Sequence, residues 1–230
     1  MKKVLICEDE ASIRSFVVVN LQRAGYTVVE AASGEEALQK YEQEPAVQVA
    51  LLDVMLPGID GFETCRCLRR MNKDLGIIML TALSQEAEKV TGLQNGADDY
   101  VTKPFSTAEL IARVDALYRR VSAAQGPSAY REEIQSGDLI LNRRTRSLQV
   151  HDRTVELTQV EYQLMECFLQ HPGETLGRAR LLEAVWGSDY YGDDKIVDVN
   201  VRRLRMKLEK DPSNPVYIQT VWGQGYRWNG

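Results

Sequence analysis

The sequence predicts an α/β protein in two parts, a doubly wound parallel sheet followed by a smaller unit of helices and short strands. Three observations lead to this fold class. Residues 1–121 alternate short apolar runs with helical segments. The stretch "SAAQGPSAYREE" then loses all periodicity. After it, short strand-like pieces precede three helices and a closing pair of strands, which is a different order of elements.

The first part contains five strand-like runs separated by helical segments. Two of those segments begin with a capping box, Ser33–Glu36 and Ser106–Glu109, in which side chains satisfy N–H groups at a helix start. Strands that alternate with helices form a parallel sheet that is covered on both faces. The five runs are Val4–Cys7, Val28–Glu30, Val49–Leu52, Gly76–Leu80 and Asp99–Thr102.

The lapse in periodicity marks the boundary between the parts. We expect one domain over 1–121, a linker over 122–133 and a second domain over 134–230. Another capping box, Thr158–Glu161, begins the first helix of the second domain. The other expected elements are strands at Leu139–Leu141, Ser147–Val150 and Thr154–Leu157, helices at Arg178–Trp186 and Lys195–Lys210, and a hairpin of Val216–Val221 with Tyr226–Trp228.

Composition places the chain among globular cytoplasmic proteins. It is 44% hydrophobic and 27% charged, and no apolar run approaches the roughly 18 residues of a membrane span. The four cysteines follow no disulfide framework, which favours reduced thiols. The net charge of −5 argues against nucleic acid, but the helix 195–210 carries six basic residues against two acids. This local stripe is a candidate electrostatic footprint for DNA.

Acidic residues stand where two of the predicted strands end. In a flavodoxin-like sheet, the first and third strands flank the switch point where ligands bind. Glu8 and Asp9 follow the first strand and Asp53 ends the third, so three carboxylates should converge and favour Mg²⁺. Thr81 and Lys103 end the next two strands and add donors that suit a phosphoryl group. Each residue alone has a plainer explanation, such as a turn cap or an acidic first helical turn.

The basic helix has two distinct faces. At 100° per residue, Val197, Val201, Leu204 and Leu208 form one narrow apolar stripe that packs on the core. We expect Lys195, Val199, Arg202 and Arg203 to point away from it, with Arg205 to one side and Asn200 on a flank. Arginine bonds guanine or phosphate, asparagine reads adenine, and a small apolar side chain meets a thymine methyl. A solvated face of alternating charge is the alternative.

Several motifs together resemble a known family. "CEDE", "LLDVMLPGIDG", "IIMLTAL" and "GADDYVTKPF" are similar to the receiver domain of two-component response regulators. "VDVNVRRLRMKLE" and "IQTVWGQGYRW" resemble the winged helix-turn-helix DNA-binding domain of OmpR/PhoB-type regulators. The resemblance covers nearly the whole chain, with the motifs in the family's order and spacing.

The resemblance implies a role for each residue of the acidic site. Asp53 would accept a phosphoryl group from a sensor histidine kinase. Asp9, Asp53 and the backbone carbonyl of Met55 would hold Mg²⁺, with Glu8 contributing. Thr81 and Lys103 would contact phosphoryl oxygens, and the bond after Lys103 would be cis. Tyr100 would be the aromatic switch residue, although an ordinary strand tyrosine is the plainer reading.

Phosphorylation would promote a homodimer through the fourth helix, fifth strand and fifth helix. Gln94 and Asp115 depart from the oppositely charged pair expected there, so we expect dimerisation to be weaker or to use Asp98 with Arg119 or Arg120. The alternative is that these charges are solvated helix faces. The residues assigned to this face are Lys89 paired with Glu109, Asp99 paired with Arg113, Val90 and Leu93 at its centre, and Asp98 as a substitute partner for Arg119 or Arg120.

The closing hairpin would complete the DNA contact through Thr220, Tyr226 and Arg227. Trp222 stands where many relatives have an arginine. Tryptophan lacks the charged guanidinium, so the resemblance does not decide whether Trp222 contacts DNA. The expected target is promoter DNA with tandem repeats, and RNA polymerase is a further candidate partner.

Two other functions compete with a phosphorylation-controlled transcription factor. A Mg²⁺-dependent aspartyl phosphatase would want an acid two residues after Asp53, but Met55 stands there. A regulator active without phosphate would not need the complete acidic site. We expect no enzyme beyond slow self-phosphorylation and dephosphorylation.

Overall fold

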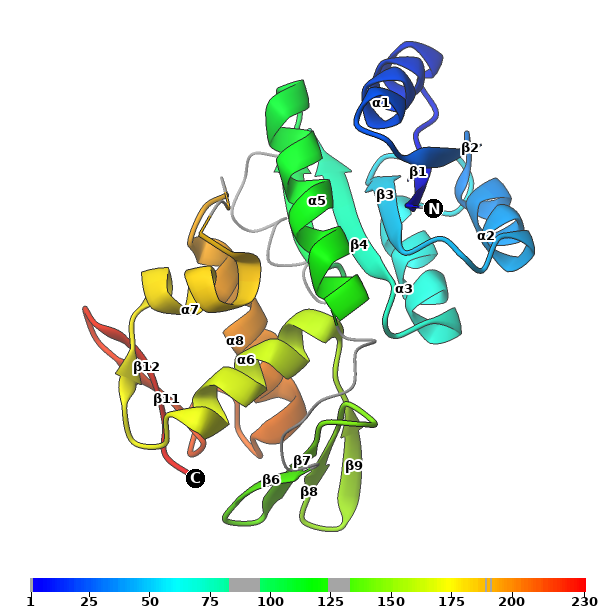
Figure 1. Cartoon of the computed structure of the whole chain (residues 1–230). Helices are drawn as coiled ribbons and strands as arrows, with labels where there is room; N and C mark the ends of the chain where they lie inside the picture. Colours follow the sequence, from blue (N-terminus) through cyan, green and yellow to red (C-terminus); the bar gives the residue numbers. More distant parts are fainter. Residues whose placement is uncertain (1, 83–95, 124–132, 189, 191) are drawn as a thin grey trace. The chain divides into compact units, whose positions relative to one another are not determined.

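The computed structural model describes residues 2–82, 96–123, 133–188, 190 and 192–230 (Figure 1). The chain divides into two compact units, Met1–Ala124 and Gln125–Gly230. The last helix of the first unit runs to Ala123, two residues into the predicted linker. The domain limits given above stay a prediction.

The first unit is built on a five-stranded parallel sheet. Its strand order, β2-β1-β3-β4-β5, is the flavodoxin-like order expected from the sequence. Because β1 and β3 are neighbours at the point where the order reverses, residues that follow these two strands meet at one edge. The strands are β1 (Lys3–Cys7), β2 (Thr27–Ala31), β3 (Val49–Asp53), β4 (Gly76–Thr81) and β5 (Asp99–Thr102).

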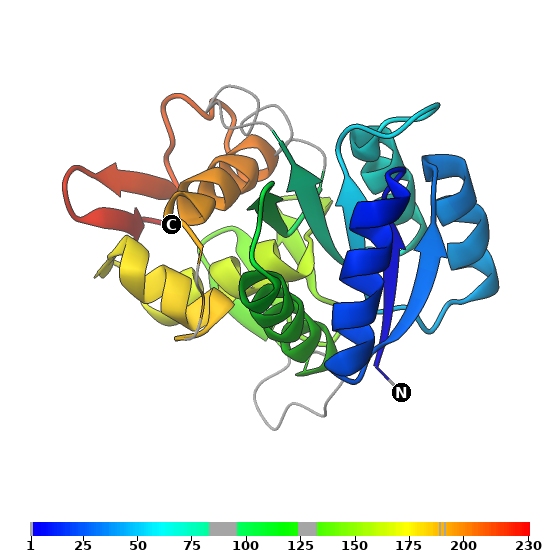
Figure 2. The ribbon, with the colours of Figure 1, turned by 90° about the horizontal axis from the view of Figure 1, so that it is seen from above.

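Helices cover both faces of this sheet, which explains its continuous apolar runs. Val4 and Ile6 face the core formed with α1 (Ala11–Arg23) and α5 (Thr107–Ala123). Leu5 and Cys7 face the core formed with the other pair of helices. Figure 2 shows α1 and α5 together on one side of the sheet. The second pair is α2 (Gly34–Gln43) and α3 (Gly61–Met71).

The expected fourth helix falls within residues 83–95, outside the described part of the chain. Side chains cap the helices before and after β3. Ser33 accepts a hydrogen bond from the Glu36 N–H (3.2 Å), as the sequence predicts. The Glu36 carboxylate bonds the N–H of Ala32 (2.7 Å), one residue before the position that a full capping box would use. Asp60 caps α3 through the Glu63 N–H (2.7 Å).

In the part that the structure describes, the second unit contains two antiparallel sheets and three helices. The full capping box predicted at Thr158 and Glu161 is present. Two strands were missed, because β6 begins in the predicted linker and β10 has only two residues. The elements are β6 (Glu133–Ser136), β7 (Leu139–Asn142), β8 (Ser147–Val150), β9 (Arg153–Glu156), α6 (Gln159–Gln170), β10 (Thr175–Leu176), α7 (Arg178–Trp186), α8 (Lys195–Leu208), β11 (Ile218–Val221) and β12 (Gly225–Trp228).

The two sheets of this unit have the strand orders β6-β7-β8-β9 and β10-β12-β11. The apolar stripe expected on the last helix is confirmed, since Val197, Val201 and Leu204 are fully buried in α8. Among the helices that the structure describes, none has the length and apolar character needed to span a bilayer.

Substitution of Gly61, the first residue of α3, tests how tightly the end of β3 is packed against that helix. A Cβ at this position would overlap the carbonyl oxygen of Asp53. We therefore expect Gly61→Ala to lower the free energy of unfolding of the first unit by about 2 kcal/mol, measured by denaturant titration. Equal stability of the Gly61 variant and wild type would contradict this packing argument.

Candidate functional site: an acidic pocket and a basic helix

The predicted convergence of three carboxylates is confirmed. Glu8, Asp9 and Asp53 each offer a carboxylate oxygen, and these oxygens lie within 4.8 Å of one another. Glu8 and Asp53 are buried, with 1% and 5% of their surface exposed, whereas Asp9 is open to solvent. Buried like charges at this distance repel one another unless a cation balances them.

Lys103, which follows β5, supplies a positive charge to this pocket. Its Nζ donates to Glu8 Oε2 (2.7 Å) and to Asp53 Oδ2 (2.8 Å). Burial acts to lower the pKa of Lys103, but its hydrogen bonds to Asp53 and Glu8 outweigh burial and raise that pKa. Lys103 is therefore charged at neutral pH. Burial raises the pKa of Glu8, and the hydrogen bond from Lys103 opposes this shift.

The donor set of the pocket fits Mg²⁺. It consists of carboxylates from two strand ends, and Mg²⁺ prefers oxygen ligands of this kind. The Met55 side chain is exposed, and its backbone N–H donates to Asp53 Oδ1 (3.2 Å), which holds the Met55 peptide beside the carboxylate. Glu8, Asp9, Asp53 and the Met55 carbonyl are the groups that would hold the ion.

The remaining residues assigned to this site lie in β4, in β5 or directly after β5. Thr81 ends β4 and is buried, with 4% exposure. The peptide bond between Lys103 and Pro104 is cis, as the resemblance implies. Tyr100, in β5, is half-buried against the core between the sheet and the helices α2 and α3.

Two residues that the sequence reasoning missed hold the loops of the pocket. Arg14 Nη1 donates to the carbonyls of Glu8 (2.6 Å) and Asp9 (3.3 Å), which fixes the backbone that carries both carboxylates. The Glu35 carboxylate accepts from the N–H of Ile59 (3.0 Å) in the loop after β3. Arg14 is the only charged residue in α1 before Arg23. This isolated charge could have identified Arg14 as a candidate site residue from the sequence.

Part of the predicted dimer face makes contacts within the chain, and its pairing between subunits stays a prediction. Asp99 and Arg113, assigned to opposite subunits, are both buried and pair within the chain at 3.1 Å. Arg113 Nη2 also bonds Glu109 of the same helix (2.8 Å). Asp98 is fully buried and binds Arg69 (2.8 Å) and the Ile77 N–H (2.8 Å), so it is not an exposed partner for another chain. Lys89, Val90, Leu93 and Gln94 lie outside the described residues.

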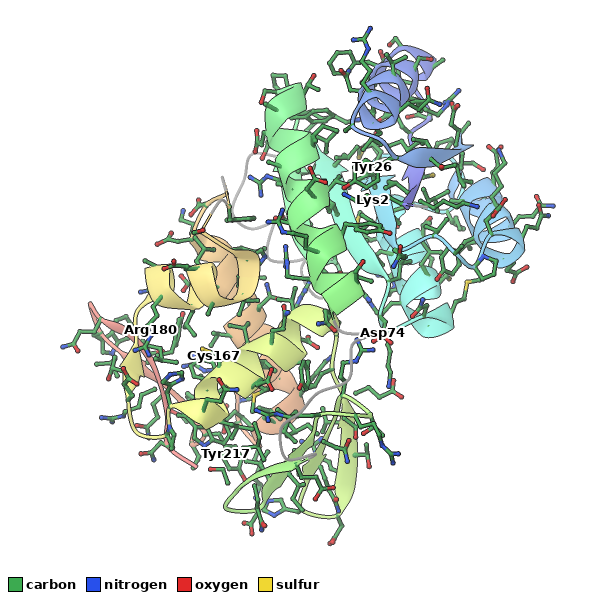
Figure 3. All side chains as sticks on the ribbon, viewed as in Figure 1. Lys2, Tyr26, Asp74, Cys167, Arg180 and Tyr217 are labelled. Carbon is green, nitrogen blue, oxygen red and sulfur yellow. The ribbon has the colours of Figure 1, made fainter. Side chains whose placement is uncertain are left out.

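Asp115, which departs from the family's charge pattern, has partners of its own. Its carboxylate accepts a short hydrogen bond from the Tyr26 hydroxyl and lies 3.6 Å from Lys2 Nζ. The Lys2 ammonium is 5.3 Å from the centre of the Tyr26 ring; both side chains are labelled in Figure 3. Asp115, in α5, therefore contacts Lys2 and Tyr26, and Lys2 directly precedes β1.

The candidate DNA-binding residues of the second unit differ in exposure. Lys195, Arg202 and Trp222 are exposed, and Trp222 at the tip of the hairpin between β11 and β12 reaches 89%. Val199, Arg205, Thr220 and Arg227 are partly buried. Asn200, Arg203 and Tyr226 are buried, with exposures of 0%, 6% and 5%.

The outward position expected for Arg203 is therefore wrong, and Asn200, which we expected on a flank of the helix, is fully buried. The Asn200 amide donates to the Ile196 carbonyl one turn earlier (2.9 Å), and its Oδ1 accepts from Arg203 Nη1 (3.2 Å). The Tyr226 hydroxyl is likewise occupied, since it donates to Asp198 (2.6 Å). A helical wheel assigns directions around an axis, but it does not reveal which neighbouring groups cover each direction. Whether these residues contact DNA stays a prediction.

Comparisons with known proteins agree with this architecture. Residues 4–115 match the family described as "Response regulator receiver domain", and residues 152–228 match "Transcriptional regulatory protein, C terminal". Response regulator DrrB, an OmpR/PhoB homologue of Thermotoga maritima, is 31% identical over 100% of both chains, with a TM-score of 0.51. A C128S mutant of RitR is 28% identical over 99% of both chains, with a TM-score of 0.80.

The chain belongs to the response regulators of the OmpR/PhoB type. It joins a receiver domain to a winged-helix domain, and this pairing defines a transcription regulator. The receiver domain implies a histidine kinase as partner, and the C-terminal domain implies binding to DNA.

Cysteine reactivity reports on the environment of the acidic pocket. Burial, followed by the nearby charges of Glu36, Asp53 and Glu8, raises the pKa of the Cys7 thiol to about 12. Cys65 and Cys167 are also buried, and Figure 3 labels Cys167 on α6. Only Cys67 is partly exposed.

We expect iodoacetamide at pH 8 to modify Cys67 first and to leave Cys7 unmodified, because thiolate is the reactive form and the folded protein suppresses it at Cys7. Peptide mass spectrometry after timed labelling gives the order, and labelling in denaturant provides the control in which all four cysteines react. Modification of Cys7 as fast as Cys67 in the folded protein would refute the assigned environment.

Proposed function

We propose that the first unit is a phosphorylation switch in which Asp53 accepts a phosphoryl group from a partner histidine kinase. The observation that carries this proposal is the carboxylate of Asp53, which lies between Glu8, Asp9 and the ammonium of Lys103. Asp53 ends β3, and the Met55 N–H donates to its carboxylate, which holds the Asp53 side chain in place. A carboxylate in such a site is a competent nucleophile for phosphoryl transfer.

Each residue of the pocket has a separate role in the phosphoryl transfer. A carboxylate oxygen of Asp53 forms the new bond to phosphorus, and the bond from phosphorus to the donor nitrogen breaks. Lys103 neutralises charge on the phosphoryl oxygens, and the Thr81 hydroxyl donates to another of them. A bound Mg²⁺ supplies further neutralisation and alignment of those oxygens. Glu8, Asp9, Asp53 and the Met55 carbonyl would hold it.

The phosphoryl group adds a charge of about −1.5 to −2 at neutral pH, and this charge biases a two-state element. Moving a population from 1:99 to 99:1 takes about 5.5 kcal/mol of differential stabilisation. We place that element at β5 and the helices beside it, with Tyr100 turning inward as Thr81 moves toward the phosphoryl group. The homodimer forms on this face through Lys89, Val90, Leu93 and Glu109, and the internal pair of Asp99 and Arg113 rearranges or remains inside each subunit.

The second unit binds promoter DNA through α8 and the terminal hairpin, as a dimer on tandem repeats. Lys195 and Arg202 on α8 are exposed donors, and the hairpin adds Thr220, Arg227 and the open indole of Trp222. Arginine and lysine contacts to phosphates supply most of the affinity and make it depend on salt.

Phosphorylation of Asp53 is tested with a small phosphodonor and Mg²⁺. We expect intact mass to show one stable phosphoryl adduct in the wild type and none in Asp53→Asn or after chelation of the metal. Asp60→Asn is the matched control, because asparagine also caps α3 and Asp60 lies outside the pocket.

An adduct that persists in Asp53→Asn, or that forms equally without Mg²⁺, would refute the assignment. Continuous release of phosphate over many turnovers would identify an aspartyl phosphatase instead. Equal DNA binding with and without the adduct would identify a regulator that works without phosphate.

The basic helix is tested with Arg202→Ala, using a duplex selected from a random pool by the wild-type protein. We expect a loss of about 1–3 kcal/mol in binding free energy if Arg202 reads a base. The slope of log affinity against log salt should become shallower by about 0.9 if it neutralises a phosphate. Fluorescence anisotropy at several salt concentrations separates the two contacts.

Arg144→Ala is the charge-matched control, since Arg144 is exposed in the turn between β7 and β8 rather than on α8. Identical affinities for the Arg202 and Arg144 variants would remove α8 from the DNA-binding surface.

A further inference from the structure

The terminal hairpin is attached to α8 by a series of charged side chains on one face of the helix. Asp198 and Arg205 lie in α8, and Glu209 directly follows its last residue; the three are spaced by seven and four residues, so at 100° per residue they fall within an arc of about 40°. Each of the three bonds the hairpin or the residues just before it. This stripe runs along α8 separately from the apolar stripe that faces the core.

The base of the hairpin is fixed by Glu209 and Arg205. The Glu209 carboxylate, 6% exposed, accepts from the backbone N–H groups of Val216 (2.9 Å), Tyr217 (2.9 Å) and Ile218 (3.0 Å). The Arg205 guanidinium donates to the Ile218 carbonyl (2.6 and 2.9 Å) and to the Thr220 hydroxyl (2.8 Å). Together they hold β11 to the carboxyl-terminal half of α8.

Asp198 fixes the second strand of the hairpin to the other half of the helix. Its Oδ1 accepts from the Tyr226 hydroxyl on β12 (2.6 Å) and from Arg178 Nε at the start of α7 (2.6 Å). The Tyr226 ring contacts two guanidinium groups, with Arg178 at 5.3 Å and Arg205 at 5.5 Å from its centre. One carboxylate oxygen thus joins α7, α8 and β12.

The negative charge of Asp198, considered alone, is unfavourable for binding DNA. Asp198 lies one turn before Arg202 and three residues after Lys195 on the proposed DNA-binding helix, where a negative charge repels phosphates. Its hydrogen bonds offer a compensating effect, because they orient the Arg178 side chain and the hairpin relative to α8.

We propose that Asp198 is a positioning residue for DNA binding, which sets the hairpin and Arg178 relative to α8 through its acceptor oxygen. The inference rests on the proposed DNA-binding function of the second unit. It makes a prediction opposite in sign to simple electrostatics: loss of the acceptor should weaken DNA binding even though a negative charge is removed.

Comparison of Asp198→Ala with Asp198→Asn isolates the acceptor. Both substitutions remove the same charge, but only asparagine retains an oxygen that accepts from Tyr226 and Arg178. On the wild-type-selected duplex, we expect Asp198→Asn to bind at least as tightly as wild type. We expect Asp198→Ala to bind about tenfold more weakly than Asp198→Asn, since alanine cannot accept the hydrogen bonds from Tyr226 and from the charged Arg178.

Asp194 supplies the matched control. It is exposed, directly precedes α8 and makes no capping hydrogen bond through its side chain. Asp194→Ala and Asp194→Asn should therefore bind DNA equally well, and at least as tightly as wild type. Tyr226→Phe removes only the hydroxyl donor and keeps the ring, so it should weaken binding in the same direction as Asp198→Ala. It also tests the inference if Asp198→Ala fails to fold, which thermal unfolding of each variant will show.

Equal binding by Asp198→Ala and Asp198→Asn, or unchanged binding by Tyr226→Phe, would overturn the inference while the proposed function stands. Failure of the wild type to select any duplex would overturn both.

Discussion

The ammonium of Lys103 bonds two buried carboxylates, and the chemistry assigned to the first unit depends on this interaction. Glu8 and Asp53 are brought together by the ends of β1 and β3, and without a nearby cation their charges would destabilise the fold. Lys103 arrives from the end of β5, two strands away from β3 in the sheet. The same cation that makes the acidic pair tolerable is placed to meet a phosphoryl group on Asp53.

The order of the strands explains why these groups meet. In a parallel sheet all carboxyl ends lie at one edge, and the reversal between β1 and β3 opens that edge to a ligand. Gly61 packs against the Asp53 carbonyl, and Arg14 holds the carbonyls of Glu8 and Asp9. The pocket is therefore supported by backbone contacts as well as by charge.

Much of this architecture follows from local patterns in the sequence. The five strands, the capping box at Thr158 and the meeting of the three carboxylates depend on short-range rules and on the geometry of parallel sheets, so they could be predicted. The pairing of Asp99 with Arg113 inside the chain and the burial of Asn200 could not. They depend on which side chains lie within contact distance of one another in the folded chain. Helical periodicity carries no information about those tertiary contacts. Asp198 shows the same limit, because its partners come from α7 and from a strand 28 residues later.

The balance between Lys103 and the carboxylates is tested most directly by the affinity for Mg²⁺ of Lys103→Met compared with wild type. Amide chemical shifts of Asp9, Asp53 and Met55 in the full chain report binding at the pocket. If Lys103 and Mg²⁺ are attracted by the same carboxylates, removal of the ammonium removes its repulsion of the ion. The variant should then show saturable shifts at these residues and bind Mg²⁺ more tightly than wild type. Unchanged affinity, or no response of these amides to Mg²⁺ in either protein, would contradict the account.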